Sequence, residues 1–162
     1  MICWVVERAL AARNIARAIV ATDDERIADA VEAAGHEALM TSARHRSGTD
    51  RIAEVAASLA DAEIIVNVQG DEPLISPATI ERAVDALIED EGAGIVTTWE
   101  PIESVADVLN PDVVKIVVDG NERAVYFSRS PVPYPRDAVR QHGTLEAALE
   151  HEPGLLAAFR KH

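Results

Sequence analysis

Residues 64–73 have the sequence IIVNVQGDEP, and this stretch decides the fold class. Its first five residues are mostly β-branched and apolar, which is typical of a strand buried on both faces in a parallel sheet. The strand is followed by a glycine, two carboxylates and a proline. Because open α/β sheets bind ligands just outside the carboxyl ends of their strands, these acids stand where chemistry is usually placed. A carboxylate there suits Mg²⁺, but an acidic turn that only solubilises the strand end fits the spacing equally well.

The segments on both sides of this stretch alternate between helical and strand patterns. Apolar residues at helical spacing predict helices at residues 2–10, 27–34, 52–59, 77–88 and 105–109, and a weak helix from 145 to the end. Strands are expected at 15–21, 37–40, 64–68 and 95–99, and a hairpin joins 113–118 to 124–127. This alternation predicts an α/β fold, a parallel sheet with helices on both faces, in a single domain over residues 1–162.

Composition narrows the function classes. Fifteen basic residues against 28 acidic ones give a net charge of −13, which disfavours nucleic acid and anionic membranes as partners. No apolar run approaches the roughly 18 residues that would span a bilayer. The single cysteine, Cys3, cannot form an internal disulfide and lies among apolar residues, so we expect a packing role and a cytoplasmic location.

Several common catalytic motifs are absent from the sequence. There is no G-x-G-x-x-G after a strand, no P-loop and no G-x-S-x-G. The five histidines lack the spacing of a zinc site. The sequence therefore disfavours standard dinucleotide binding, P-loop chemistry and a covalent nucleophile.

Polar segments that follow the expected strands are the candidate site. Residues 22–24, 45–51 and 69–73 should converge on one rim of the sheet. Ser47 to Asp50 open a helix whose free N–H groups favour an anionic or hydroxyl-rich ligand, although a simple helix cap explains the same residues. Arg129, near aromatic residues at the end of the hairpin, suits carboxylate or phosphate recognition, and a solvated arginine is the alternative.

Five blocks, taken together, resemble the 3-deoxy-D-manno-octulosonate (Kdo) cytidylyltransferases, or CMP-Kdo synthetases. In order along the chain they are VATDDERIADAVEAAG, MTSARHRSGTDRIAEV, IIVNVQGDEPLI, LNPDVVKIV and VYFSRSPVPYPRD. They are collinear and cover nearly the whole sequence. The resemblance implies a Rossmann-like nucleotidyltransferase sheet, often in a homodimer, that transfers CMP from CTP to Kdo and releases pyrophosphate for lipopolysaccharide biosynthesis.

The resemblance also implies roles for individual residues. Asp71 would bind Mg²⁺, and Gln69 would face the sugar and the nucleotide, so these two are the catalytic candidates. The cytidine side would be lined by residues of the second block, namely Ser47, Gly48, Asp50 and Arg51. Arg129 and His162, the latter in a segment resembling the start of a family H-x-G-x-Y block, would lie on the sugar-acid side. Catalysis would then consist mostly of in-line positioning and charge neutralisation by Mg²⁺.

The sequence also departs from the family pattern. Family members begin with a central strand and a loop resembling P-A-R-x-x-S-x-R-L-P-x-K-P that holds the triphosphate, and a later acid completes metal binding. None of these has a match here, so we expect truncation at both ends, weak or no activity, and two neighbouring strands without a ladder partner. A cytidylyltransferase for another sugar acid and a non-catalytic module with a nucleotide-binding fold are the alternative functions.

Overall fold

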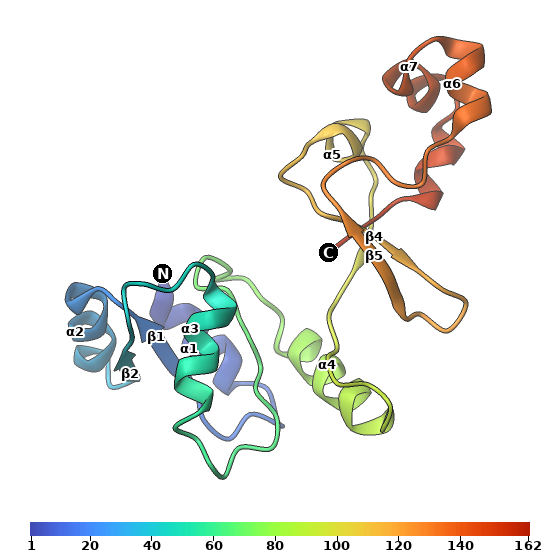
Figure 1. Cartoon of the computed structure of the whole chain (residues 1–162). Coiled ribbons are helices and arrows are strands. Elements are labelled where there is room, and N and C mark those ends of the chain that lie inside the picture. Colours follow the sequence, from blue (N-terminus) through green and yellow to red (C-terminus); the bar gives the residue numbers. More distant parts are fainter. The chain divides into compact units, whose positions relative to one another are not determined.

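Helix α1 (Ile2–Leu10) begins the chain, as the apolar spacing predicts. Its buried side carries Val5, Val6 and Ala9. The computed structural model describes all residues from 1 to 162, and they divide into two compact units, residues 1–96 and 97–162 (Figure 1). Each unit has its own hydrophobic core.

A pair of parallel strands with a helix between them forms one part of the first unit. Strand β1 (Ile19–Thr22) pairs with β2 (Glu37–Met40), and helix α2 (Glu25–Ala33) connects them. Past the end of α2, Gly35 adopts a φ of 80°, the left-handed conformation that glycine reaches without strain. The fully buried Val31 packs with Val6 and Val20, which fixes α1 and α2 against β1. The strand expected at 15–21 is present as β1, which is shorter and begins at Ile19.

Helices α3 (Gly48–Ala56) and α4 (Pro77–Glu89) complete the first unit. A second cluster joins α1 to α4 through Ala9, Ala12 and Ile80, with Val66 and Val68 packed against it. The chain after α1 is also tied to α4, because the Arg13 guanidinium binds two of its carboxylates, those of Glu81 (3.1 Å) and Asp85 (2.5 Å). Helix α4 lies where the sequence predicts it, whereas α3 begins and ends earlier than the expected helix at 52–59.

Two expected strands, at 64–68 and 95–99, are wrong as hydrogen-bonded strands. Neither segment belongs to a sheet, and a two-residue strand, β3 (Glu100–Pro101), follows the second one. Exposure along 64–68 still alternates residue by residue, as it does in a strand. The apolar pattern is therefore present, but no neighbouring strand supplies the ladder that a strand requires.

The second unit is built on an antiparallel sheet. Its strands are β3, β6 (Arg160–Lys161), β4 (Lys115–Val118) and β5 (Ala124–Ser128), in that spatial order. The β4–β5 hairpin confirms the sequence prediction, and the Asp119 carboxylate shapes its turn by accepting from the backbone N–H groups of Asn121 and Arg123 at 2.8 and 2.9 Å. The fold is thus mixed: the parallel pairing is limited to β1 and β2, and the larger sheet is antiparallel.

Helices cover the rest of the second unit. They are α5 (Val105–Leu109), α6 (Arg136–His142), α7 (Leu145–His151) and a 3₁₀-helix at Pro153–Ala158. Helix α6 is not expected from the sequence, and the weak helix predicted from 145 to the end stops at His151. The core gathers Ile102, Val108, Leu149 and Phe159, all at most 2% exposed.

Candidate nucleotide-binding site

The amino end of α3 carries polar groups close to the carboxyl ends of the parallel strands β1 and β2. Ser47 caps the helix, and its hydroxyl accepts from the Asp50 N–H at 3.1 Å while donating to the Asp50 carboxylate at 2.9 Å. Arg51 N–H donates to the Ser47 carbonyl. The N–H groups of Gly48 and Thr49 have no hydrogen-bond partner within the chain. The helix is therefore capped and still offers two free donors to an anionic or hydroxyl-rich ligand.

Arg51 joins α3 to the ends of both parallel strands. Its guanidinium forms an ion pair with Asp23 at 3.1 Å, just past β1, and donates to the Thr41 hydroxyl at 2.6 Å, just past β2. The Arg51 hydrogen bond lowers the pKa of Asp23 below its usual value. Thr41 also donates, through its N–H and its hydroxyl, to the Thr22 carbonyl at 2.8 and 3.1 Å. Two of the three expected loops therefore meet, and Arg51 is the residue that joins them.

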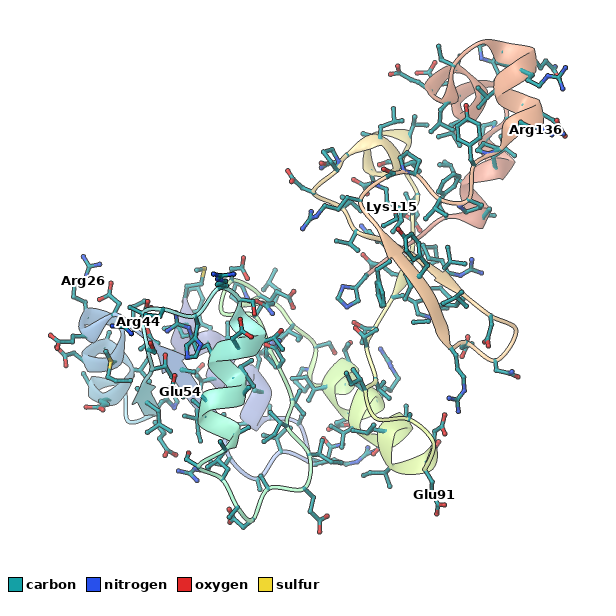
Figure 2. All side chains as sticks on the ribbon, viewed as in Figure 1. Arg26, Arg44, Glu54, Glu91, Lys115 and Arg136 are labelled. Carbon is teal, nitrogen blue, oxygen red and sulfur yellow. The ribbon has the colours of Figure 1, made fainter.

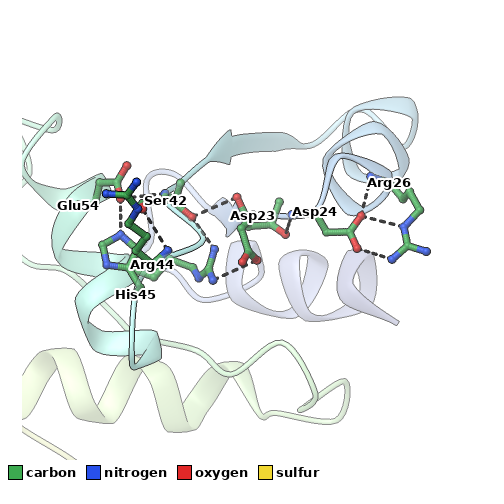
Figure 3. Close-up of polar contacts among 10 residues, drawn as sticks. Asp23, Asp24, Arg26, Ser42, Arg44, His45 and Glu54 are labelled. Carbon is green, nitrogen blue, oxygen red and sulfur yellow. Dashed lines mark hydrogen bonds and ion pairs between the residues drawn. The ribbon is translucent and has the colours of Figure 1, made fainter.

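The loop before α3 is fastened by Glu54. This carboxylate accepts from the Ser42 N–H at 3.1 Å and contacts the His45 imidazole, as Figure 3 shows. The His45 contact, followed by the Ser42 N–H, lowers the pKa of Glu54. The Arg44 N–H donates to the Ser42 hydroxyl at 3.1 Å. These bonds hold residues 42–46 in place ahead of the cap.

Asp24, by contrast, has a local structural role. Its carboxylate caps α2 by accepting from the Arg26 N–H at 2.9 Å, and it also binds the Arg26 guanidinium at 2.5 Å (Figure 3). The side-chain bond to Arg26 holds the pKa of Asp24 at about 2. Of the adjacent acids that follow β1, Asp23 therefore belongs to the candidate site and Asp24 to a helix cap.

The third loop, at residues 69–73, is near the α3 loop, because residues of both line one cavity. A cavity of about 690 Å³ in the first unit is lined by Gly48 and Arg51 on α3 and by Gln69 and Gly70 after the 64–68 segment. The Glu72 N–H closes a turn on the Gln69 carbonyl at 3.2 Å. The adjacent Asp71 is exposed. The geometry thus joins this tip to the α3 loop.

The residues present limit how a metal could be held. No group of three or more histidine, cysteine, aspartate or glutamate side chains is arranged to hold a metal ion. The chain itself does not form a complete protein cage for Mg²⁺. A single exposed carboxylate such as Asp71 is nevertheless compatible with Mg²⁺, because this ion is commonly bound through one or two carboxylates together with substrate phosphates and water.

Arg129 and His162 belong to the second unit. The Arg129 guanidinium donates to the Pro111 carbonyl at 2.9 Å. The His162 ring contacts the Thr97 hydroxyl and packs edge-on against Phe127, with the ring centroids 5.3 Å apart. Both side chains therefore have structural contacts in this unit.

Lys115 is a structural residue that sequence reasoning did not identify. The side chain is fully buried in the second unit, where Figure 2 labels it. Its ammonium donates to the carbonyls of Asn110 (2.6 Å), Val113 (2.9 Å) and Arg129 (3.4 Å). Burial lowers the pKa of Lys115, and the charge of Asp107 opposes that effect. The sequence signal for this role is a lysine at the start of an otherwise apolar strand, KIVV.

Comparison with known proteins gives a consistent result. The profile of a family described as "Cytidylyltransferase" matches residues 1–153. The chain is 53% identical over 137 residues to a 3-deoxy-manno-octulosonate cytidylyltransferase of Trichlorobacter lovleyi and 55% identical over 137 residues to that of Geotalea daltonii. Each match covers 85% of this chain and 54% of the relative, so the chain spans about half the length of the curated relatives it matches.

A solved structure agrees with these relatives. It is described as CMP:2-keto-3-deoxy-manno-octonic acid synthetase complexed with CTP, and it is 40% identical with a TM-score of 0.82. The match covers 99% of this chain and 59% of the solved one. The expected Rossmann-like nucleotidyltransferase fold is thus confirmed. No helix of the chain is both long and apolar enough to cross a membrane. With a family profile over nearly its whole length and relatives at this level of identity, the chain belongs to the cytidylyltransferase family.

Proposed function

We propose that this chain carries part of the site of an enzyme that transfers CMP from CTP to 3-deoxy-D-manno-octulosonate and releases pyrophosphate. The observation that carries the proposal is the identity of 53–55% to cytidylyltransferases for this sugar acid. The shared cavity of the α3 loop and the 69–73 tip supports it. Because the match covers only 54% of these relatives, the proposal concerns the activity to which this chain contributes.

The amino end of α3 would bind the nucleotide. Gly48 and Thr49 offer free N–H groups, and an added Cβ at Gly48 would meet no atom within 4 Å. A ligand can therefore approach the backbone closely at this point. Ser47 and Asp50 fix the helix end, and Arg51 holds it against the strand ends. We assign these residues to the cytidine side.

The tip at residues 69–73 would hold the reacting groups. Asp71 would bind Mg²⁺ jointly with the phosphates of the nucleotide, and the bound ion would supply neutralisation of phosphate charge. In the reaction, a sugar-acid hydroxyl oxygen forms a bond to the α-phosphorus while the bond to the departing pyrophosphate breaks. Gln69 is the amide that would orient the reactants at this tip, since positioning supplies most of the catalysis in phosphoryl transfer.

Arg129 and His162 are proposed to recognise the sugar acid. A guanidinium binds a carboxylate through two parallel hydrogen bonds, and the sugar acid carries such a group. To do so, Arg129 would exchange its present bond to the Pro111 carbonyl for the substrate. A related sugar acid would present the same carboxylate, so recognition of Kdo in particular is the finer part of the proposal. The homodimer, the cytoplasmic location and the weak turnover of the isolated chain stay predictions.

Calorimetric titration with CTP and Mg²⁺ tests the nucleotide assignment. We expect Gly48→Ala to leave folding unchanged and to weaken CTP binding about tenfold, because the new methyl group stands between the ligand and the free N–H groups. Gly94→Ala is the matched control, since its Cβ also meets nothing within 4 Å and it lies outside the cavity lining. A chain that is folded by circular dichroism and gives no heat with CTP would favour the non-catalytic alternative.

A further inference from the structure

Asp23 lies next to the candidate site without lining its cavity. Its carboxylate makes an ion pair with Arg51, with 3.1 Å between Oδ1 and Nη2. Arg51 and Gly48 line the cavity of the first unit, whereas Asp23 and Thr41 do not. Asp23 can therefore affect a ligand in the cavity through Arg51, without touching that ligand.

The Arg51 guanidinium is engaged by the protein itself. One terminal nitrogen, Nη1, donates to the Thr41 hydroxyl at 2.6 Å, and the other, Nη2, binds Asp23. The Thr41 hydroxyl in turn donates its proton to the Thr22 carbonyl at 3.1 Å, so it accepts from Arg51 with a lone pair. Thr22 is buried at the end of β1. The guanidinium is thus bound to groups that follow both parallel strands.

The amino end of α3 depends on these bonds for its position. The Arg51 N–H donates to the Ser47 carbonyl at 3.3 Å, so Arg51 belongs to the first turn of the helix. The free N–H groups of Gly48 and Thr49 are in the same turn. Helix α3 has no fully buried residue, so apolar packing fixes it less firmly than it fixes a core helix. The bonds of Arg51 therefore contribute a large share of what holds this helix end.

We propose that Asp23 is a positioning residue for nucleotide binding: it holds Arg51 and, through it, the amino end of α3, whose free N–H groups meet the ligand. Arg51 then acts as a structural link within the protein and not as a contact to CTP. The inference rests on the proposed function, because it names the residue on which that nucleotide site depends. Asp24, the next residue, has no such role, since it binds Arg26 at the start of α2 (Figure 3).

Charge and position predict opposite effects of a substitution at Asp23. CTP is strongly anionic, so loss of a nearby carboxylate charge would strengthen its binding if Asp23 acted through charge alone. We expect Asp23→Asn to weaken CTP binding about tenfold in calorimetric titration with Mg²⁺, because the helix end loses its position. Asp24→Asn is the matched control: it removes the same charge one residue away and keeps a capping oxygen, so CTP affinity should stay within about twofold. Unchanged or tighter binding by Asp23→Asn would overturn the proposal.

A double-mutant cycle tests whether Asp23 acts through Arg51. Since Asp23→Asn and Arg51→Gln break the same link, the double variant should bind CTP within about twofold of the weaker single variant. Effects that multiply to about a hundredfold would contradict the proposal, because Arg51 would then contact the nucleotide independently of Asp23. Urea unfolding followed by Trp4 fluorescence, in chains that carry Trp99→Phe, gives the folded fraction of the first unit, and each affinity is corrected for it.

A measurement without nucleotide separates this inference from the proposed function. We expect Asp23→Asn to shift the amide NMR signals of Gly48 and Thr49 in the nucleotide-free chain, and Asp24→Asn to leave them in place. Equal shifts in both variants, or no shift in either, would refute the positioning role even when CTP binds. Absence of heat from the original chain with CTP would instead refute the nucleotide site, and the amide signals would still decide whether Asp23 positions α3.

Discussion

The two units treat their strands in opposite ways. In the second unit, β4 pairs with β5 through a five-residue connection and with β6 from the end of the chain, so the central strand has neighbours on both sides. In the first unit, β1 pairs with β2 alone, and the strand-like residues 64–68 have no ladder partner. Antiparallel pairing is achieved by a local turn, whereas parallel pairing requires long crossovers and neighbours that are distant in sequence. The first unit is therefore the part in which strand edges stay unpaired.

The 64–68 segment is less buried than the second core, so substitutions there should lower the free energy of unfolding less. The second core has residues that are at most 2% exposed, whereas along 64–68 Ile65 remains 44% exposed. Each unit also contains one tryptophan, Trp4 or Trp99. Fluorescence of Trp4→Phe and Trp99→Phe backgrounds therefore reports on the units separately during urea unfolding.

The largest effect is expected at Lys115 in the second unit. Lys115→Met removes the donor of three backbone carbonyls, and we expect it to lower the free energy of unfolding by about 2–4 kcal/mol. Lys161→Met is the matched control, because this neighbouring lysine makes partly exposed ion pairs with Glu100 and Asp107 and should cost less than about 1 kcal/mol. Urea unfolding followed by Trp99 fluorescence measures both. Equal costs would show that the buried ammonium does not hold this unit together.

A matched valine pair compares the two units directly. Val108→Ala in the fully buried second core should cost about 2–3 kcal/mol, because it leaves a cavity. Val66→Ala, at a half-buried position that lines the cavity of the first unit, should cost about 1 kcal/mol or less. Each is read from the tryptophan in its own unit. If Val66→Ala costs as much as Val108→Ala, the 64–68 segment is packed as tightly as the second core and the contrast fails.

The smallest effect is a pH dependence at Asp24. Its folded pKa of about 2 lies below its ordinary value of 3.8, so its ion pair contributes stability above pH 3.8 that is lost as the pH falls through about 2. Asp24→Asn keeps a capping oxygen but removes this dependence. A carboxyl resonance of Asp24 that titrates near 3.8 in an NMR experiment would contradict the bond to Arg26.

Local sequence signals predicted most of the fold. The helix cap at Ser47 and the β4–β5 hairpin are both determined by short stretches of residues. The strands predicted at 64–68 and 95–99 are wrong because an apolar β-branched run indicates a strand but contains no information about its partner. Helix α6 was missed because its short, polar sequence has no apolar stripe.

The candidate site was predictable to a similar degree. The rule that strand ends share a rim predicted that the three loops would approach one another, and the structure joins them through Arg51 and the cavity. The division of labour between Asp23 and Asp24 was not predictable, because it depends on which arginine reaches each carboxylate. The functional roles of Asp71, Gln69, Arg129 and His162 rest on the resemblance and stay proposals.

Residue-resolved amide hydrogen exchange of the isolated chain tests the contrast between the units most directly. We predict that the amides of residues 64–68 exchange close to the rate of an unstructured peptide, because none of them is hydrogen-bonded within the chain. Ile116 to Val118 pair with β5, and we expect their hydrogen-bonded amides to be protected at least about a hundredfold more. Equal protection of the two segments, in a monomeric sample, would contradict the account, since it would mean that the first unit already has a complete sheet.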